Sequence, residues 1–142
     1  MGRVQKVMEI GVVVKDLDKA TRLFEEVLGI KPLKIDYYEP YQMRFGYFPM
    51  GELFFELMEP AGPDGPIAQF VKTRGEGLHH VALKVGNIQE AMDGFREKGV
   101  EFLNAAPVDL ELSYANVKFA FTRPDTTCGI LFELMEEGTH PE

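Results

Sequence analysis

The chain has 142 residues, 45% of them hydrophobic, which is enough apolar content for one domain with a buried core. Its 23 acidic residues outnumber the 15 basic ones, and the net charge of −8 opposes binding to nucleic acids and to anionic membranes. The single cysteine excludes an internal disulfide, and no apolar run has the length of a membrane span or of a signal peptide's core, so we expect a cytoplasmic protein.

The first half of the sequence predicts a strand, a helix and three more strands. Residues 7–15 are rich in β-branched side chains, and Asp16 or Asp18 can cap a helix that Gly29 ends. The next strands are expected near residues 33–38, 43–48 and 52–59, with breaks at Pro40 and at residues 49–51. This half therefore has the order βαβββ.

The second half repeats this order. A linker of about residues 61–77, with a short helix over 67–73, leads to elements at 78–85 (strand), about 88–98 (helix), 100–103, 117–122 and 129–136 (strands), while residues 104–116 form a loosely specified loop. The predicted fold class is α+β, a single domain 1–142 of two tandem βαβββ modules, about 5–60 and about 78–137, that form a curved mixed β-sheet cleft.

An internal repeat supports the two modules. Phe55-Glu56-Leu57-Met58-Glu59 recurs unchanged 77 positions later as Phe132-Glu133-Leu134-Met135-Glu136, and an offset of 71 positions aligns Val14–Ala20 with Val85–Ala91. In each copy a carboxylate interrupts an apolar strand, where burial is costly unless a metal, a positive charge or a proton neutralises it. The two equivalent carboxylates suggest a site between the halves.

Four polar positions stand out on the predicted strands: Glu9, Glu56, His80 and Glu133. The offset of 71 pairs Glu9 with His80, so each module carries one potential metal ligand on its first strand and one on its last. Because side chains alternate between the two faces of a strand, Glu9 shares its face with Gly11, and His80 shares its face with Ala82. These small neighbours leave room for a ligand.

The chain resembles the vicinal oxygen chelate superfamily, which includes glyoxalases, extradiol dioxygenases and bleomycin-resistance proteins. Within it the chain is most similar to the methylmalonyl-CoA epimerases. The similarity is densest in the segments Val14-Lys15-Asp16-Leu17, Pro66-Ile67-Ala68-Gln69-Phe70, Gly75-Glu76-Gly77-Leu78-His79-His80-Val81-Ala82 and Gly129-Ile130-Leu131-Phe132-Glu133-Leu134. The resemblance implies a divalent metal bound by Glu56, His80 and Glu133.

One departure from the epimerase pattern concerns the metal. Glu9 stands where the epimerases have a histidine on the first strand. A set of Glu9, Glu56, His80 and Glu133 is harder and more anionic than two histidines with two acids, which favours Mn²⁺, Co²⁺, Mg²⁺ or Ni²⁺, with Zn²⁺ also considered. The same set argues against an Fe(II) oxygenase, which uses two histidines and one carboxylate.

A second departure concerns proton transfer. Epimerisation α to a thioester carbonyl requires two groups that flank one carbon and a group that stabilises the enolate. The resemblance implies Glu133 as one base, and Glu9 is the candidate for the other. The second base of the epimerases is a carboxylate on the third strand of the first half, and the alignment places Arg44 near that position.

We therefore expect a metal-dependent isomerase that acts through a metal-stabilised enolate on a small molecule, such as an acyl-CoA thioester, as a homodimer with no nucleic-acid or membrane partner. One alternative is an isomerase of the glyoxalase I type (lactoylglutathione lyase-like). The other is a metal-free small-molecule-binding protein of the bleomycin-resistance type. Metal content distinguishes the enzymes from the binding protein.

Overall fold

A computed structural model describes residues 4–111 and 116–137. In chain order its elements are β1 (Val4–Val13), α1 (Leu17–Leu23), the π-helix η1 (Phe24–Leu28), β2 (Ile35–Tyr38), the 3-10 helix η2 (Glu39–Tyr41), β3 (Met43–Met50), β4 (Leu53–Pro60), α2 (Pro66–Arg74), β5 (Gly77–Val85), α3 (Ile88–Glu97), β6 (Val108–Glu111), β7 (Asn116–Phe121), the 3-10 helix η3 (Pro124–Thr126) and β8 (Phe132–Glu137). None of the helices in these described ranges is long and apolar enough to cross a membrane.

The chain divides into two compact units, Glu9–His79, which we call module one, and Met1–Met8 with His80–Glu142, which we call module two. The strands of module one follow the order β2-β3-β4-β1, and β1 runs parallel to β4 while the other neighbours are antiparallel. The strands β5 to β8 follow the order β5-β8-β7-β6, with β5 parallel to β8. The α+β class and the repeated βαβββ order are confirmed.

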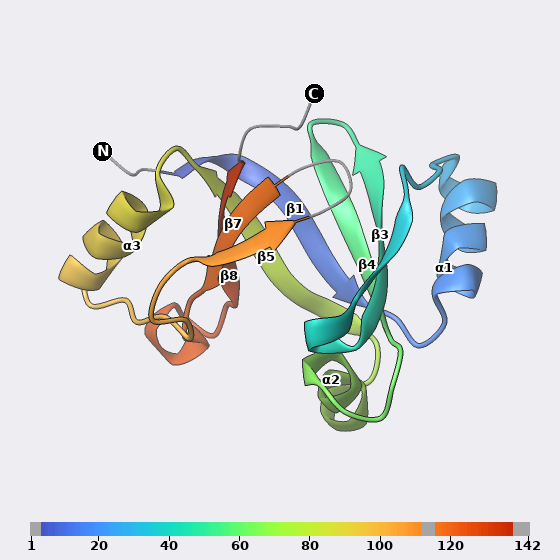
Figure 1. The fold of residues 1–142 in the computed structure, drawn as a ribbon. Coiled ribbons are helices and arrows are strands. Elements are labelled where there is room, and N and C mark those ends of the chain that lie inside the picture. Colours follow the sequence, from blue (N-terminus) through green and yellow to red (C-terminus); the bar gives the residue numbers. More distant parts are fainter. Residues whose placement is uncertain (1–3, 112–115, 138–142) are drawn as a thin grey trace. The chain divides into compact units, whose positions relative to one another are not determined.

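The helices α1 and α3 each pack against one face of the strands of their own module (Figure 1). In module one, Leu17 of α1 packs with Leu57 of β4 and Phe48 of β3 in a buried cluster that Phe24 and Phe55 extend. In module two, the corresponding cluster joins α3 to β5, β7 and β8 through the buried residues Val85, Ile88, Ala91, Met92, Ala120 and Leu134. On the strands that carry the predicted ligands, the apolar residues alternate with those ligands. These apolar residues form the face that the helix covers.

The second glutamate of each repeat caps a helix. Glu59 Oε1 accepts a hydrogen bond from the backbone N–H of Leu17 at 2.9 Å, and Glu136 Oε1 accepts one from Ile88 at 2.8 Å. These N–H groups have no partner inside their helices, and a carboxylate there also interacts favourably with the helix dipole. The repeated pentapeptide thus links the last strand of each module to the start of its helix.

The predicted strand at 100–103 is wrong. Phe102 forms only an isolated bridge with Thr122, and the strand beside β7 is β6, inside the region predicted as a loop. Next to this bridge, the side-chain Oδ1 of Asn104 accepts the hydrogen bond from Phe121 N at 2.7 Å, where a continued strand would offer a backbone carbonyl. Residues 112–115 of the predicted loop lie outside the described residues.

Candidate metal and active site

In module one, Glu9 and Glu56 lie on the face opposite α1. Phe55 and Leu57 pack with the helix, so the alternating Glu56 between them faces the other way. The same alternation places Glu9 and Gly11 opposite the helix-covered Val12. Gly11 lies directly beside Glu56 in the parallel register of β1 and β4, which confirms the predicted small neighbour.

The two carboxylates of module one are buried and close together. Glu9 is 3% exposed and Glu56 is 5% exposed, and a carboxylate oxygen of one lies within 4.8 Å of a carboxylate oxygen of the other. Two ionised carboxylates at this separation repel each other, and burial strengthens the repulsion by removing water. A cation or a shared proton offsets that repulsion.

In module two, His80 and Glu133 form the corresponding pair. Leu83 and Val85 of β5 and Leu134 of β8 pack with α3, so His80 and Glu133 lie on the opposite face. His80 Nε2 lies 3.3 Å from Glu133 Oε1, and both side chains are buried. Here an imidazole faces a carboxylate, so the pair can neutralise itself if the histidine is protonated, or present one nitrogen and one oxygen to a metal.

Sequence reasoning missed one aromatic residue beside each glutamate. Tyr47 of β3 is the register partner of Glu56, and Phe121 of β7 is the register partner of Glu133. Phe121 also meets the His80 ring edge to face, with 5.6 Å between the ring centroids. Alternation along each strand gives the face of these residues, but only the strand register shows which of them lies beside a glutamate.

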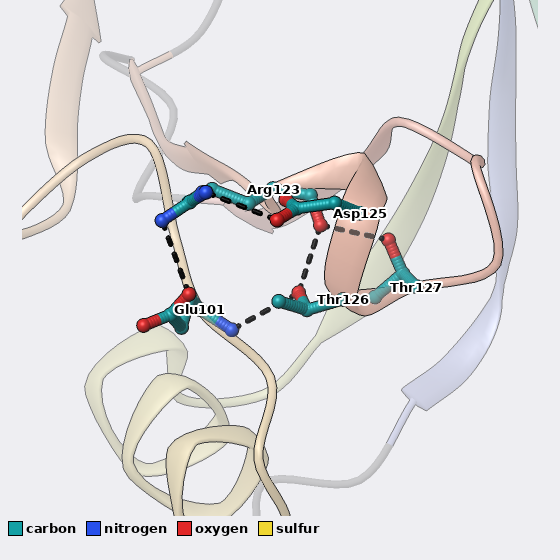
Figure 2. Close-up of polar contacts among 5 residues, drawn as sticks. All are labelled: Glu101, Arg123, Asp125, Thr126 and Thr127. Atoms are coloured by element: carbon teal, nitrogen blue, oxygen red, sulfur yellow. Dashed lines mark hydrogen bonds and ion pairs between the residues drawn. The ribbon is translucent and has the colours of Figure 1, made fainter.

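The turn before β8 is held by the side chains of Glu101 and of residues 122–126. Figure 2 shows Arg123 bonded to Glu101 at 3.1 Å and to Asp125 at 3.0 Å, while the Thr126 hydroxyl accepts from Glu101 N and donates to the Arg123 carbonyl. The fully buried Thr122 then accepts from Phe132 N through its hydroxyl, at 3.2 Å. These bonds fix the start of β8 one residue before Glu133.

Arg44 does not lie beside the candidate ligands. It forms ion pairs with Asp18 of α1 and with Glu59, which is its register partner on β4. Residue 44 alternates with Phe45 and Tyr47, so it belongs to the helix-covered face together with Phe48. The positions of β3 that share the face of Glu56 are Met43, Phe45, Tyr47 and Pro49, and none of these described positions carries an acid.

The donor set fits a divalent metal. In module one, the buried carboxylate oxygens of Glu9 and Glu56 lie near enough to bind one ion, and such oxygens are the ligands preferred by hard cations. In module two, His80 and Glu133 offer one nitrogen and one oxygen at 3.3 Å. Each pair lies on the strand face opposite the one that packs against α1 or α3.

Two βαβββ modules, each with a mixed sheet and with candidate metal ligands on its first and last strands, are the arrangement of the vicinal oxygen chelate fold. The family model "Glyoxalase/Bleomycin resistance protein/Dioxygenase superfamily" matches residues 8–121, and the chain belongs to this superfamily. The fold is also that of methylmalonyl-CoA epimerase from Mycobacterium tuberculosis, whose structure matches with a TM-score of 0.88 and 24% identity over 98% of this chain and 92% of that one.

Two sequence relatives span most of the chain. It is 30% identical over 127 residues to the uncharacterized protein YqjC of Bacillus subtilis, covering 89% of each chain. It is 29% identical over 126 residues to the mitochondrial methylmalonyl-CoA epimerase of Bos taurus, covering 88% of this chain and 70% of the relative. The resemblance to the epimerases read from the sequence is confirmed.

Proposed function

We propose that the chain is a metal-dependent isomerase, similar to methylmalonyl-CoA epimerase, that removes and returns the proton α to a thioester carbonyl. The observation that carries this proposal is the buried pair His80 and Glu133, 3.3 Å apart on the face opposite α3, in a chain whose relatives include methylmalonyl-CoA epimerases. It is supported by the second buried pair, Glu9 and Glu56, at the equivalent strands of module one.

The proposed metal ligands are Glu9, Glu56, His80 and Glu133. A divalent ion bound by them would supply positive charge to stabilise the enolate oxygen that develops when the proton leaves. Three carboxylates and one imidazole favour Mn²⁺, Co²⁺, Mg²⁺ or Ni²⁺. Glu56 lies inside β4 and His80 lies inside β5, so the hydrogen-bonded strands hold the backbone of both proposed ligands in place.

Glu133 is the proposed base that takes the α-proton. Its carboxylate lies on a strand whose start is fixed by Thr122, so its direction is set before substrate binds. Inversion needs a second group that returns a proton from the opposite side, and we propose Glu9 for this role because the described inward positions of β3 carry no acid. Substitution of Glu133 should therefore abolish exchange of the α-proton, whereas substitution of Glu9 should slow inversion more than exchange.

Solvent exchange tests the proposal directly. Methylmalonyl-CoA incubated with the protein and Co²⁺ in D₂O should lose its α-proton NMR signal faster than in a protein-free sample. Exchange requires only one base, so it is expected even if inversion is slow. No exchange above the protein-free rate would remove methylmalonyl-CoA epimerisation from consideration.

A second candidate is an isomerase of the glyoxalase I type, which acts on thiol adducts of α-ketoaldehydes. Glu9 favours it, because that metal shell accepts an oxygen ligand at the first-strand position. Turnover of the hemithioacetal of glutathione and methylglyoxal, without exchange of methylmalonyl-CoA, would select it. A protein that binds none of Mn²⁺, Co²⁺, Ni²⁺ or Zn²⁺ in calorimetry would instead be a metal-free binding protein.

The homodimer stays a prediction. Sheet edges such as β2 present backbone groups that a second copy can cover, and Tyr37 on this edge strand is 50% exposed. Light scattering at micromolar concentration should give twice the 16.0 kDa mass of the chain. A mass of one chain would contradict the prediction.

A further inference from the structure

A fully buried hydroxyl lies in the core of module two, close to the strand position of the proposed base. Thr122 is 0% exposed, and it directly follows Phe121, which is the register partner of Glu133. Because side chains alternate along a strand, Thr122 lies on the face that packs against α3, together with the apolar Ala120. Burying a hydroxyl on an apolar face is unfavourable unless it is hydrogen-bonded. The presence of threonine at this position therefore requires a physical reason.

The reason is that Thr122 holds the backbone of Phe132 by both of its polar groups. Thr122 N donates to the Phe132 carbonyl oxygen at 2.9 Å, and the Thr122 hydroxyl accepts from Phe132 N at 3.2 Å. In a regular antiparallel pair, the second bond would go to the backbone carbonyl of Thr122. The side chain thus replaces the last backbone bond of the ladder, one residue before Glu133.

A second hydroxyl holds the first one in place. The Thr127 oxygen lies 2.7 Å from the carbonyl oxygen of Ile130 and 3.3 Å from that of Arg123, and it donates its one proton to these carbonyls. The contact of 3.3 Å between the hydroxyl oxygens of Thr122 and Thr127 therefore uses the proton of Thr122. The oxygen of Thr122 then keeps its lone pairs for Phe132 N.

Module one holds its buried glutamate in a different way. Phe48 of β3 corresponds to Thr122, because each directly follows the register partner of its module's glutamate. The ladder of Phe48 continues as far as the pair of Met50 and Leu53, whereas the ladder between β7 and β8 ends at the glutamate itself. Backbone pairs therefore flank Glu56 on both sides along its strand. In β8, the side chain of Thr122 supplies the bond on the N-terminal side.

We infer, on the basis of the proposed function, that Thr122 is a positioning residue for proton transfer by Glu133. Its hydroxyl fixes the backbone of Phe132 and so the point from which the Glu133 side chain starts. Proton transfer is sensitive to this point, because a displacement of about 1 Å can slow a reaction by about 100-fold. Thr122 lies on the helix-covered face, so it should affect the rate of proton transfer more than the binding of substrate.

Thr122→Val tests the inference, because valine keeps the shape of threonine and removes the hydroxyl. With Co²⁺ and methylmalonyl-CoA in D₂O, the kcat of α-proton exchange should fall by about tenfold or more, while KM changes by less than about twofold. Thr122→Ser keeps the hydroxyl and should restore most of the lost rate. A normal kcat in Thr122→Val, or an equal loss in Thr122→Ser, would overturn the inference.

A loss of stability is separated from a loss of position by a second core variant. Ile88→Val removes one methylene group from the buried α3 cluster of the same module, and it leaves the bonds at the start of β8 intact. Both variants are compared at a temperature at which circular dichroism shows them folded. If Ile88→Val loses the same share of kcat as Thr122→Val, the effect is one of stability and the inference is wrong.

Hydrogen exchange of the Phe132 amide gives a readout that does not depend on activity. In Thr122→Val this amide should exchange about tenfold or more faster, relative to the amide of Leu134, which pairs with Ala120 further along the ladder. An unchanged ratio would overturn the inference. If Thr122→Val does not fold, Thr127→Val replaces it, because it removes the acceptor of the Thr122 proton. Normal values of both kcat and the amide ratio in Thr127→Val would then count against the inference.

Failure of the proposed function gives a different result from failure of this inference. If the wild-type protein does not exchange the α-proton of methylmalonyl-CoA, the proposed function is wrong and Thr122 has no base to position. If the wild-type protein exchanges it and Thr122→Val does so at the same rate, only the inference is wrong.

Discussion

The two modules place different chemistry at equivalent positions. In module two, His80 and Glu133 combine a group that can be positive with one that is negative, at 3.3 Å. In module one, Glu9 and Glu56 are both carboxylates, and both are buried. The repeated fold therefore does not impose one ligand set. A self-neutralising pair can exist without a metal, whereas a pair of buried carboxylates requires a counter-charge or a proton.

This contrast assigns different tasks to the modules. Module two has the proposed base and the proposed nitrogen ligand, and the turn of Figure 2 fixes the strand that carries Glu133. Module one adds negative charge and an aromatic surface, with Tyr47 in the place that Phe121 takes in module two. We expect substitutions in module two to affect proton removal and metal retention, and substitutions in module one to affect metal preference and substrate choice.

The largest expected effect is on proton removal. Glu133→Gln keeps the size of the side chain but removes the base, so α-proton exchange should fall by about 10² to 10⁴. NMR in D₂O measures the rate, with Glu137→Gln at the far end of the same strand as the control. Exchange at the normal rate in Glu133→Gln would show that another group is the base.

The second effect is on metal affinity. His80→Ala removes the only nitrogen of the proposed ligand set, and the affinity for Co²⁺ in calorimetry should fall by about 100-fold or more. Substituting a residue that only hydrogen-bonds to a metal ligand already lowers metal affinity by about 10 to 100-fold. The neighbour His79 gives the matched control, because it lies on the other face of β5 and meets Phe70 of α2 edge to face, with 5.2 Å between the ring centroids. A similar loss in His79→Ala would mean that folding, not ligation, is being measured.

A third substitution makes module one resemble module two. Glu9→His gives each first strand an imidazole and lowers the negative charge of the set. The ratio of Zn²⁺ affinity to Mg²⁺ affinity should rise by at least about tenfold, or 1.4 kcal/mol, because imidazole is a softer ligand than a carboxylate. Glu9→Gln separates the loss of charge from the gain of nitrogen. An unchanged ratio in Glu9→His would exclude Glu9 from the metal site.

Much of this comparison could be predicted from the sequence, because duplication supplies an internal alignment. The repeated pentapeptide located β4 and β8, and alternation gave the faces of Glu56 and Glu133 without any coordinates. The small neighbours Gly11 and Ala82 followed from the same alternation, and both lie beside the glutamates in the register.

The errors fall where tertiary contacts override local pattern. The segment 100–103 has strand-like residues, yet Phe121 N donates to the side chain of Asn104 instead of to a backbone carbonyl, and Leu103 is 61% exposed. The alternating residues of β6 were the overlooked signal. For β3, the alignment placed Arg44 near the position of the epimerases' second base, and a shift of one residue along a strand moves every side chain to the other face. The ion pairs with Asp18 and Glu59 depend on contacts that no local pattern reveals.

The smallest expected effect compares the two helix caps. Glu59→Gln and Glu136→Gln each weaken the bond to the first helical N–H group, and each should lower the free energy of unfolding by about 0.5–1 kcal/mol. Glu59 also pairs with Arg44, whose other partner Asp18 lies on α1. Glu59→Gln should therefore cost a few tenths of a kcal/mol more than Glu136→Gln, as expected for a partly exposed ion pair. Urea unfolding of both variants measures the difference. The double variant Arg44→Met with Glu59→Gln supplies the control, because it removes the ion pair from both sides. If Glu136→Gln is the more destabilising single variant, the cap of module two contributes more than its hydrogen bond indicates, and the assignment of the extra stability to Arg44 is wrong.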